Sequence, residues 1–443
     1  MPKTIKSATY SCNACGAVAS TWSGRCPLCG EWNSLEIAAD SQLSGYSKLT
    51  AKTMSESINS KEARLETAIN GVDQVFGGGI VAGSVNLISG EPGMGKSTLL
   101  LQICAAIANK CEVLYVSGEE SLHQVGMRAK RLNLTPKHLK IAATNSTDDI
   151  SREIESGKFK LVVVDSIQTV RCLEVGSSAG SISQVTNSSA LLARAAKQSN
   201  TAVILVGHIT KEGNIAGPKL LEHIVDVVLS LEGDQSGGLK LLRVSKNRFG
   251  STNETAIFEM KQTGLIPVIN PSAILLAERK ITDGSIVLAT MEGSRPILVE
   301  VQALVNPTSY GYPKRAASGL DLSRLNLLLA MMERRTSLKL NDKDVYVNLV
   351  GGLRLNEPAG DLAIVMAVAS AARGKKLNSN AVVFGEVGLS GEIRHVPFID
   401  KRLAEARALG FEYAIGPKTP GNKSSSFLQP VIEVKQALNT YLS

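Results

Sequence analysis

Long apolar runs are missing from this sequence of 443 residues. No run approaches the ~20 consecutive apolar residues of a membrane-spanning helix, so we expect no transmembrane segment and no membrane partner. The first residues, Met1 to Ser7, also lack the apolar stretch of a secretory signal. Apolar residues still make up 44% of the chain, which is enough to bury substantial cores and excludes global disorder. We therefore expect a soluble, cytoplasmic protein.

The net charge is +8, which only weakly favours a nucleic-acid partner, because many basic proteins have none. The length predicts two or three domains. Residues 1–35 are rich in Cys and Gly, whereas residues 36–63 are polar and lack periodicity, as is typical of a linker.

Residues 64–268 alternate short apolar runs with segments of helical length, which predicts an α/β domain with a parallel sheet. The expected parallel strands are 85–89, 112–117, 161–165 and 202–207. Later runs at 227–231, 239–245 and 255–260 lack intervening helices and are expected to extend the sheet as hairpins. Residues 272–443 mix strand-like segments with amphipathic helices, expected near 323–333, 360–373 and 398–409, and predict a separate α+β domain.

The strongest motif is a phosphate-binding loop that matches Gly-x4-Gly-Lys-Ser at every fixed position. A predicted strand precedes the loop and a helix follows it, so its backbone N–H groups can cradle phosphates at the helix start. Lys96 is expected to reach the β- and γ-phosphates of ATP, and the Ser97 hydroxyl to ligate Mg²⁺. The predicted ATP-binding residues are Gly90, Glu91, Pro92, Gly93, Met94, Gly95, Lys96, Ser97 and Thr98.

Carboxylates at the ends of two later predicted strands complete the expected site. Asp165 ends the run 161–165 and is the candidate for a second magnesium contact through the ion's water shell. Glu119 and Glu120 follow strand 112–117 at its carboxyl end, where ligands bind in such sheets. We favour Glu119 as the base that activates the attacking water and keep Glu120 as the alternative. Either could instead be a residue at a helix N-terminus, stabilised by the helix dipole.

Four of the seven cysteines lie within eighteen residues of one another. Cys12, Cys15, Cys26 and Cys29 form two Cys-x2-Cys pairs separated by ten residues, a spacing that suits tetrahedral Zn²⁺. A unit this small needs metal binding to fold. Its Trp22, Arg25 and Trp32 could contact either DNA or protein. The other three cysteines, Cys104, Cys111 and Cys172, show no ligand spacing and are expected in the core.

The residues around the phosphate loop resemble the RecA/DnaB branch of phosphate-loop ATPases. The resemblance includes Asn70-Gly71-Val72-Asp73 and the glycine-rich stretch 76–83. In Lys246-Asn-Arg-Phe-Gly250 the two cations lie two residues apart, on one face of an extended segment. The resemblance implies that Arg248 is an arginine finger for the nucleotide of a neighbouring subunit and Lys246 a second cation. The alternatives are a solvated basic turn and a phosphate clamp for DNA.

Three later stretches, 356–363, 384–392 and 400–410, resemble the Lon protease domain. The resemblance places Ala359 where the nucleophilic serine belongs and Arg402 where the activating lysine belongs. Alanine carries no nucleophile, and arginine stays protonated. Lys401 is one residue away, which is about 100° around a helix. We therefore predict a scaffold without peptidase activity. Its basic residues either follow a DNA backbone or form a solvated face: Lys314, Arg315, Arg334 and Arg335.

The order of cysteine pairs, RecA-like ATPase and disabled Lon-like domain resembles the bacterial RadA/Sms DNA-repair family over essentially the whole chain. The resemblance implies a DNA-dependent ATPase that acts with RecA recombinase in branch migration, as a hexameric ring moving on single-stranded and branched DNA. A Lys- and Gly-containing loop at 210–219 is the candidate DNA contact, and His208 a candidate γ-phosphate sensor, although a lone His is more often a packed residue. An ATP-dependent protease and a nucleotide-switched scaffold ring remain the rival interpretations.

Overall fold

The structure is a computed structural model of the 443-residue chain. It describes residues 10–12, 18–19, 22–27, 30–37, 53, 63–208, 221–233, 238–309, 311–377, 380–418 and 426–442. The chain forms two compact units, Met1–Lys61 and Glu62–Ser443, which we describe one at a time. None of the helices in the described part of the chain is long and apolar enough to cross a membrane.

The first unit contains a small antiparallel sheet in the order β2 (Val18–Ala19), β1 (Tyr10–Cys12) and β3 (Leu35–Ile37). Among the residues of this unit that the structure describes, Cys26 and Leu35 are buried together, with the partly buried Tyr10 against them.

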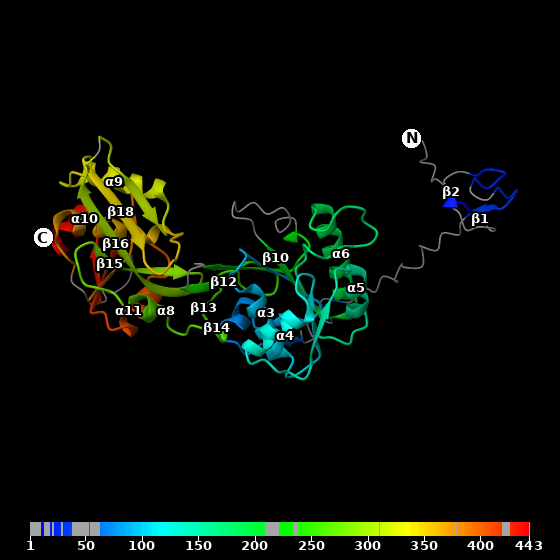
Figure 1. The fold of residues 1–443 in the computed structure, drawn as a ribbon. Coiled ribbons are helices and arrows are strands. Elements are labelled where there is room, and N and C mark those ends of the chain that lie inside the picture. The colour runs from blue at the N-terminus through cyan, green and yellow to red at the C-terminus, as the bar shows by residue number, and fades with distance from the viewer. Residues whose placement is uncertain are drawn as a thin grey trace. The chain divides into compact units, whose positions relative to one another are not determined.

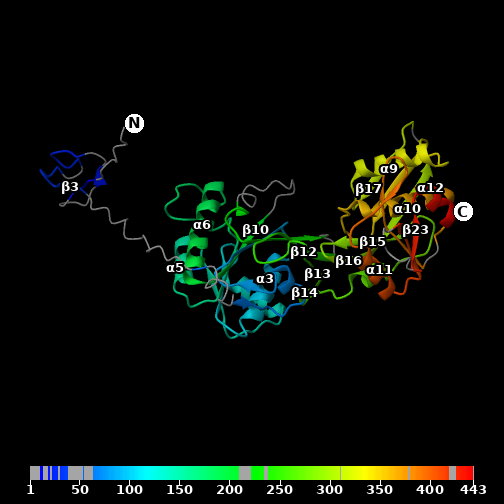
Figure 2. The ribbon, with the colours of Figure 1, turned by 180° about the vertical axis from the view of Figure 1, so that it is seen from behind.

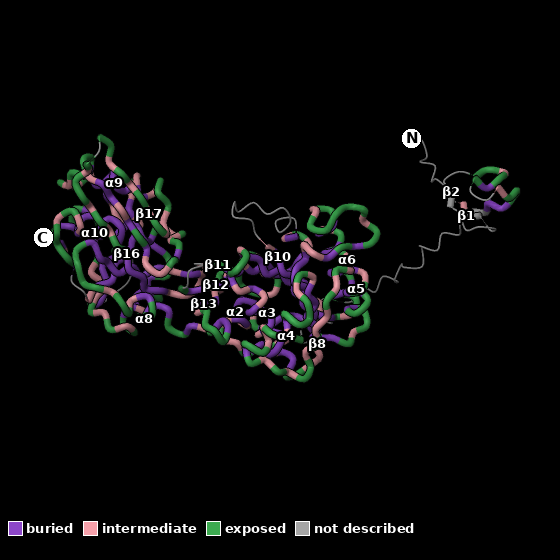
Figure 3. The backbone as a smooth tube through the Cα atoms, in the orientation of Figure 1, coloured by how far each residue is buried: buried purple, intermediate pink, exposed green. Residues whose placement is uncertain are grey.

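The second unit begins with a nine-stranded sheet (Figure 1). Its central strands β11, β6, β10, β9, β7 and β8 run parallel, and β12, β13 and β14 add an antiparallel edge. Because helices cover both faces, the inner strands β6, β10, β9 and β7 are almost continuously buried, as Figure 3 shows in purple, whereas the edge strand β8 is partly exposed. In sheet order the strands are β14 (Gly264–Pro267), β13 (Thr255–Lys261), β12 (Leu239–Asn247), β11 (Val227–Gly233), β6 (Val85–Gly90), β10 (Ala202–His208), β9 (Leu161–Asp165), β7 (Val113–Ser117) and β8 (Leu139–Ala143).

Two apolar cores lie on the two faces of this sheet. One contains residues of α3 (Lys96–Ile107) and α4 (Leu122–Arg131), and the other contains residues of α5 (Thr147–Glu155) and α6 (Ile182–Ser199). The short α2 (Val72–Val75) and the pair β4 (Arg64–Leu65) and β5 (Ile80–Val81) precede β6. The predicted RecA-like parallel sheet and its hairpin extension are thus confirmed, and β8 and α5 are elements that the sequence pattern did not reveal.

A second, seven-stranded mixed sheet follows (Figure 2). Its strands in order are β17 (Arg315–Ser318), β18 (Lys343–Leu349), β16 (Arg295–Pro307), β15 (Ser285–Glu292), β19 (Ala381–Val383), β22 (Tyr413–Pro417) and β23 (Leu428–Val431). Its helices are α8 (Pro271–Leu276), α9 (Leu322–Arg335), α10 (Asp361–Arg373), α11 (Ile399–Ala408) and α12 (Val434–Tyr441), and the short elements are η1 (Pro358–Gly360), β20 (Glu386–Val387) and β21 (Ile393–Arg394). The three predicted helices correspond to α9, α10 and α11.

The two sheets of the second unit share part of one apolar core. Leu239, Leu241 and Ile257 of the first sheet belong to the same buried cluster as the second sheet and its helices. An ion pair between Arg243 of β12 and Glu292 of β15, at 2.5 Å, lies beside it. Our domain boundaries near residues 268–272 stay a prediction, since the contacts do not divide the unit there.

Candidate nucleotide site and its surroundings

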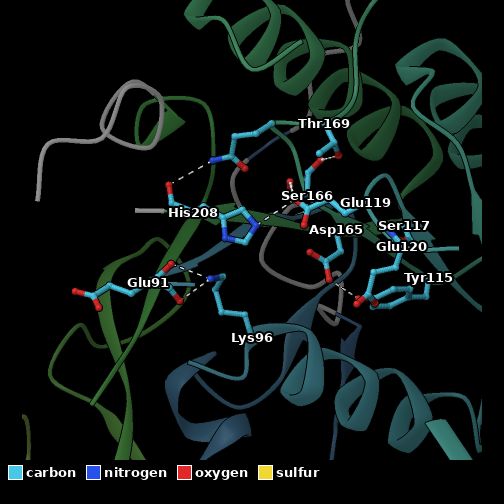
Figure 4. A network of polar contacts seen from close by, with 12 residues as sticks. Glu91, Lys96, Tyr115, Ser117, Glu119, Glu120, Asp165, Ser166, Thr169 and His208 are labelled. Carbon is cyan, nitrogen blue, oxygen red and sulfur yellow. Dashed lines mark hydrogen bonds and ion pairs between the residues drawn. The ribbon is translucent and has the colours of Figure 1, made fainter. Parts of the chain in front are cut away.

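The phosphate loop joins the end of β6 to the start of α3. Gly90, Gly93 and Gly95 have φ values of 158°, 82° and 97°, which only glycine adopts without strain, so these positions let the backbone turn around a ligand. The Lys96 ammonium donates to the carbonyl oxygens of Gly90 at 2.8 Å and Glu91 at 3.0 Å. Figure 4 shows these two contacts of the Lys96 ammonium as dashed lines.

Lys96 is a buried residue whose ammonium lies near two carboxylates. Burial lowers the pKa of its ammonium, and the negative charges of Asp165 and Glu119 oppose that shift. A desolvated ammonium beside loop glycines suits a polyanionic ligand, because its attraction to phosphate is less screened than in water. This electrostatic arrangement fits the β- and γ-phosphates that we assign to Lys96.

Asp165 is the last residue of β9 and is buried. The phenol of Tyr115, on the neighbouring strand β7, donates a hydrogen bond to Asp165 Oδ2. Burial raises the pKa of Tyr115, and the charge of Asp165 and the hydrogen bond to it raise it further, so the phenol stays a neutral donor. Tyr115 therefore fixes one carboxylate oxygen. No sequence signal points to it, since a lone tyrosine in an apolar strand looks like any core residue.

The two glutamates that follow β7 have different partners. Glu119 Oε1 accepts a hydrogen bond from Ser166 Oγ at 2.6 Å and lies 3.3 Å from His208 Nε2. Glu120 instead pairs with Arg128 of α4 at 2.5 Å. Figure 4 shows Glu119 on the side of Asp165 and His208. Of the two carboxylates, only Glu119 joins the cluster around Lys96.

His208 ends β10 and lies in register with Gly90, the first residue of the phosphate loop. It is therefore placed between the loop and Glu119. The predicted DNA-contacting loop, Thr210 to Lys219, begins two residues later and lies outside the described residues.

The predicted ligands of magnesium are hard oxygen donors, the Ser97 hydroxyl and the Asp165 carboxylate, which is the donor chemistry that Mg²⁺ prefers. Ser97 is half-buried at the start of α3, where the loop ends. The site therefore fits Mg·ATP: Lys96 provides a cation for the phosphates, and Ser97 and Asp165 provide oxygen ligands for the metal. Bound magnesium would supply charge neutralisation of the phosphates.

Lys246 and Arg248 lie elsewhere. The Lys246 ammonium donates to the carbonyl oxygens of Glu222 and Val225, the latter at 2.8 Å. Arg248 pairs with Asp226 at 3.0 Å. The other oxygen of Asp226 accepts the N–H of Val85, the first residue of β6, whereas the phosphate loop starts at the last residue of that strand. The structure thus does not bring these two cations to the phosphate loop of their own chain.

The four predicted zinc ligands are only partly described. Cys15 and Cys29 lie outside the described residues, and of Cys12 only the backbone, in β1, is described. Cys26 is buried, and its carbonyl oxygen accepts a hydrogen bond from the Gly30 N–H at 3.0 Å. Gly30 has a φ of 77°. This backbone contact beside a cysteine is compatible with a metal knuckle, and the side chains of Trp22 and Trp32 are exposed.

In the C-terminal part, the positions that correspond to the catalytic serine and lysine of Lon are occupied by Ala359 and Arg402. Ala359 is buried in η1, and Arg402 of α11 is fully buried. Arg402 forms two hydrogen bonds with the carboxylate of Glu357, at 2.9 and 2.6 Å, and another with the Ala289 carbonyl. The sequence predicted the two replacements, but it gave no sign that Glu357 would neutralise Arg402.

A loop rich in glycine between a buried parallel strand and a helix, with carboxylates from two neighbouring strand ends, defines a RecA-like phosphate-loop ATPase. Family models agree along the chain. Residues 51–214 match an AAA domain, residues 10–36 a rubredoxin metal binding domain, and residues 328–420 the subunit ChlI of Mg-chelatase.

Comparison with curated proteins gives the family. The chain is 45% identical to DNA repair protein RadA of Listeria monocytogenes, over 94% of this chain and 93% of that protein. It is 46% identical to the RadA of Pseudomonas aeruginosa over 92% of each chain, and 45% identical to that of Bacillus subtilis over 92% of each. The chain belongs to the RadA family.

Proposed function

We propose that this chain is a DNA-dependent ATPase that acts in DNA repair and homologous recombination. Its relatives carry the name DNA repair protein, and its nucleotide site combines a buried Lys96 with carboxylates at two strand ends. In this proposal it processes recombination intermediates and stimulates branch migration together with RecA recombinase. The protein forms a ring, which by family resemblance is a hexamer. This ring moves along single-stranded and branched DNA in the cytoplasm.

Hydrolysis in this proposal uses four residues of one chain. Lys96 holds the β- and γ-phosphates, and Ser97 and Asp165 hold the magnesium that neutralises them. Glu119 accepts the proton of the attacking water, since it is the carboxylate whose neighbours are Ser166 and His208 rather than an arginine. His208 then senses the γ-phosphate through Glu119 and passes the signal to the DNA-contacting loop that follows β10.

The site is completed by a second copy of the chain. Five residue steps along β6 separate Val85, beside Asp226 and Arg248, from Gly90, which is about 16 Å at the rise of a strand. An arginine side chain does not span that length, so Arg248 cannot reach its own nucleotide. Arg248 and Lys246 act on the nucleotide of the neighbouring subunit, which makes a ring the working form.

The N-terminal unit binds zinc through Cys12, Cys15, Cys26 and Cys29. The match of residues 10–36 to a rubredoxin metal binding domain supports this assignment. The exposed tryptophans Trp22 and Trp32 give the unit a contact surface for DNA or for a protein partner.

The deciding experiment measures ATP hydrolysis with and without single-stranded DNA, and the unwinding of a forked DNA substrate. We expect single-stranded DNA to raise the rate strongly and the fork to be unwound only when ATP is present. The Lys96→Ala variant is the control and should lose both activities. Hydrolysis that ignores DNA, together with an intact fork, would favour the nucleotide-switched scaffold ring instead.

The remaining rival, an ATP-dependent protease, is opposed by the chemistry at Ala359 and Arg402. A buried arginine that is paired with Glu357 has no free base to offer a nucleophile. Degradation of casein in the presence of ATP would revive this rival, and we expect none.

A further inference from the structure

We infer that Asp226 is the residue that positions Arg248 for the phosphate loop of a second copy of the chain. This inference rests on the shared site proposed above and names the part of it that holds the arginine. Asp226 directly precedes β11 and belongs neither to the phosphate loop nor to the motif at residues 246–250.

Asp226 has the environment of an anchor. Its side chain is 6% exposed, while that of Arg248 is 52% exposed. Oδ2 accepts the Val85 N–H at 3.0 Å, and Oδ1 accepts from Arg248 Nη1 at 3.0 Å. The backbone is tied at the same place, since Asp226 N–H donates to the Val85 carbonyl at 2.8 Å and Arg248 N–H donates to the Asp226 carbonyl at 3.1 Å.

These contacts fix one edge of the guanidinium and leave much of the side chain in solvent. A buried carboxylate that loses its cationic partner is costly, so Asp226 holds Arg248 firmly. An arginine that must meet a phosphate on another subunit gains from being held, because a displacement of about 1 Å in a catalytic group can lower a rate ~100-fold. In this inference, the exposed part of the Arg248 side chain faces the neighbouring subunit.

Lys246 adds hydrogen bonds to the segment that carries Asp226. Its ammonium bonds to the carbonyls of Glu222 and Val225, in the segment that leads to Asp226. Burial lowers the pKa of Lys246 and the positive charge of Arg248 lowers it further, whereas Asp226 and Glu222 oppose the shift. Asp226, which pairs with Arg248 and also lies near Lys246, therefore offsets part of the repulsion between the two cations, together with Glu222.

The test is the Asp226→Asn variant, which keeps an oxygen for the Val85 N–H but removes the charge that attracts Arg248. We expect the kcat for ATP to fall by about 10- to 100-fold, with the KM for ATP within about 2-fold, because each chain's own phosphate loop is intact. Asp149→Asn removes a surface carboxylate paired with Arg152 at 3.4 Å and should leave the rate unchanged.

Mixed oligomers separate positioning from a folding defect. Co-expressed Asp226→Asn and Lys96→Ala chains should regain activity, because the Lys96→Ala chain supplies a well-held Arg248 to the intact loop of its neighbour. The Arg248→Ala chain mixed with Lys96→Ala is the reference. If that reference pair recovers and the Asp226→Asn pair does not, the inference is wrong while the shared site stands. If neither pair recovers, the shared site itself is wrong.

A double variant keeps the inference testable if Asp226→Asn folds poorly in the mixture. Asp226→Asn combined with Arg248→Ala should be no slower than Arg248→Ala alone, because Asp226 acts only through Arg248. Rate losses that multiply in the double variant would overturn the inference.

Discussion

The Glu119→Gln variant is expected to bind ATP normally and to lose hydrolysis by about 10²- to 10⁴-fold, the usual contribution of a general base. Glutamine keeps an oxygen that can accept the hydrogen bond from Ser166, so the local geometry should survive. It cannot accept a proton from water, so the chemical step should fail. Steady-state hydrolysis and equilibrium binding of a fluorescent ATP analogue measure the two effects separately.

Glu120→Gln is the matched control for this prediction. Glu120 forms a partly exposed ion pair with Arg128, and such pairs contribute only about 0–1 kcal/mol. Its turnover should therefore stay close to that of the unaltered protein. A normal rate in Glu119→Gln, or a large loss in Glu120→Gln alone, would move the base to the other carboxylate.

The fold could be predicted from the sequence wherever a local pattern has one physical meaning. Continuous apolar runs at 161–165 and 202–207 mean strands buried on both faces, and β9 and β10 lie there. The phosphate loop is equally local, because glycine spacing, strand and helix are adjacent in the chain. Strand β8 was missed since its residues are half-exposed and mixed in polarity, which gives no clear period.

The parts of the site that could not be predicted depend on contacts between residues far apart in sequence. Tyr115 meets Asp165 fifty residues away, and Asp226 meets Val85 at a separation of 141. A sequence shows that an acid follows a strand, but it does not show which donor faces it. The distinction between Glu119 and Glu120 is of the same kind, since it depends on Arg128 and Ser166 rather than on either glutamate.

Arg402, which stands at the position of the activating lysine in the resemblance to Lon, has a structural environment. Arg402 is 0% exposed and contacts the ring of Phe384, the carbonyl of Ala289 and the carboxylate of Glu357. Glu357 also accepts from Thr290 Oγ1 and from the Met291 N–H. Arg402 is thus the centre of a buried network of hydrogen bonds that ties α11 to β15 and to Glu357.

Breaking this network is expected to produce the largest loss of stability among the variants considered. Glu357→Ala leaves the Arg402 charge buried without its partner, and such a loss destabilises a protein by about 3–5 kcal/mol. Urea unfolding followed by a signal from the C-terminal part measures the change. Glu386→Ala, which removes a partly exposed carboxylate 4.0 Å from the exposed Arg394, is the control and should cost less than about 1 kcal/mol.

The same pair predicts a dependence on pH. Burial alone raises the pKa of Glu357, but the hydrogen bonds and charge of Arg402, with Thr290 and Met291, outweigh it and hold the pKa below the usual 4.5. Because the folded-state pKa is lowered, the stabilisation is complete above the ordinary carboxyl pKa and is lost as the pH falls through the folded value. The difference in unfolding free energy between the unaltered protein and Glu357→Ala should therefore be constant near neutrality and shrink below pH 4.5. A difference that is small at neutral pH, or that grows in acid, would show that Glu357 does not neutralise Arg402.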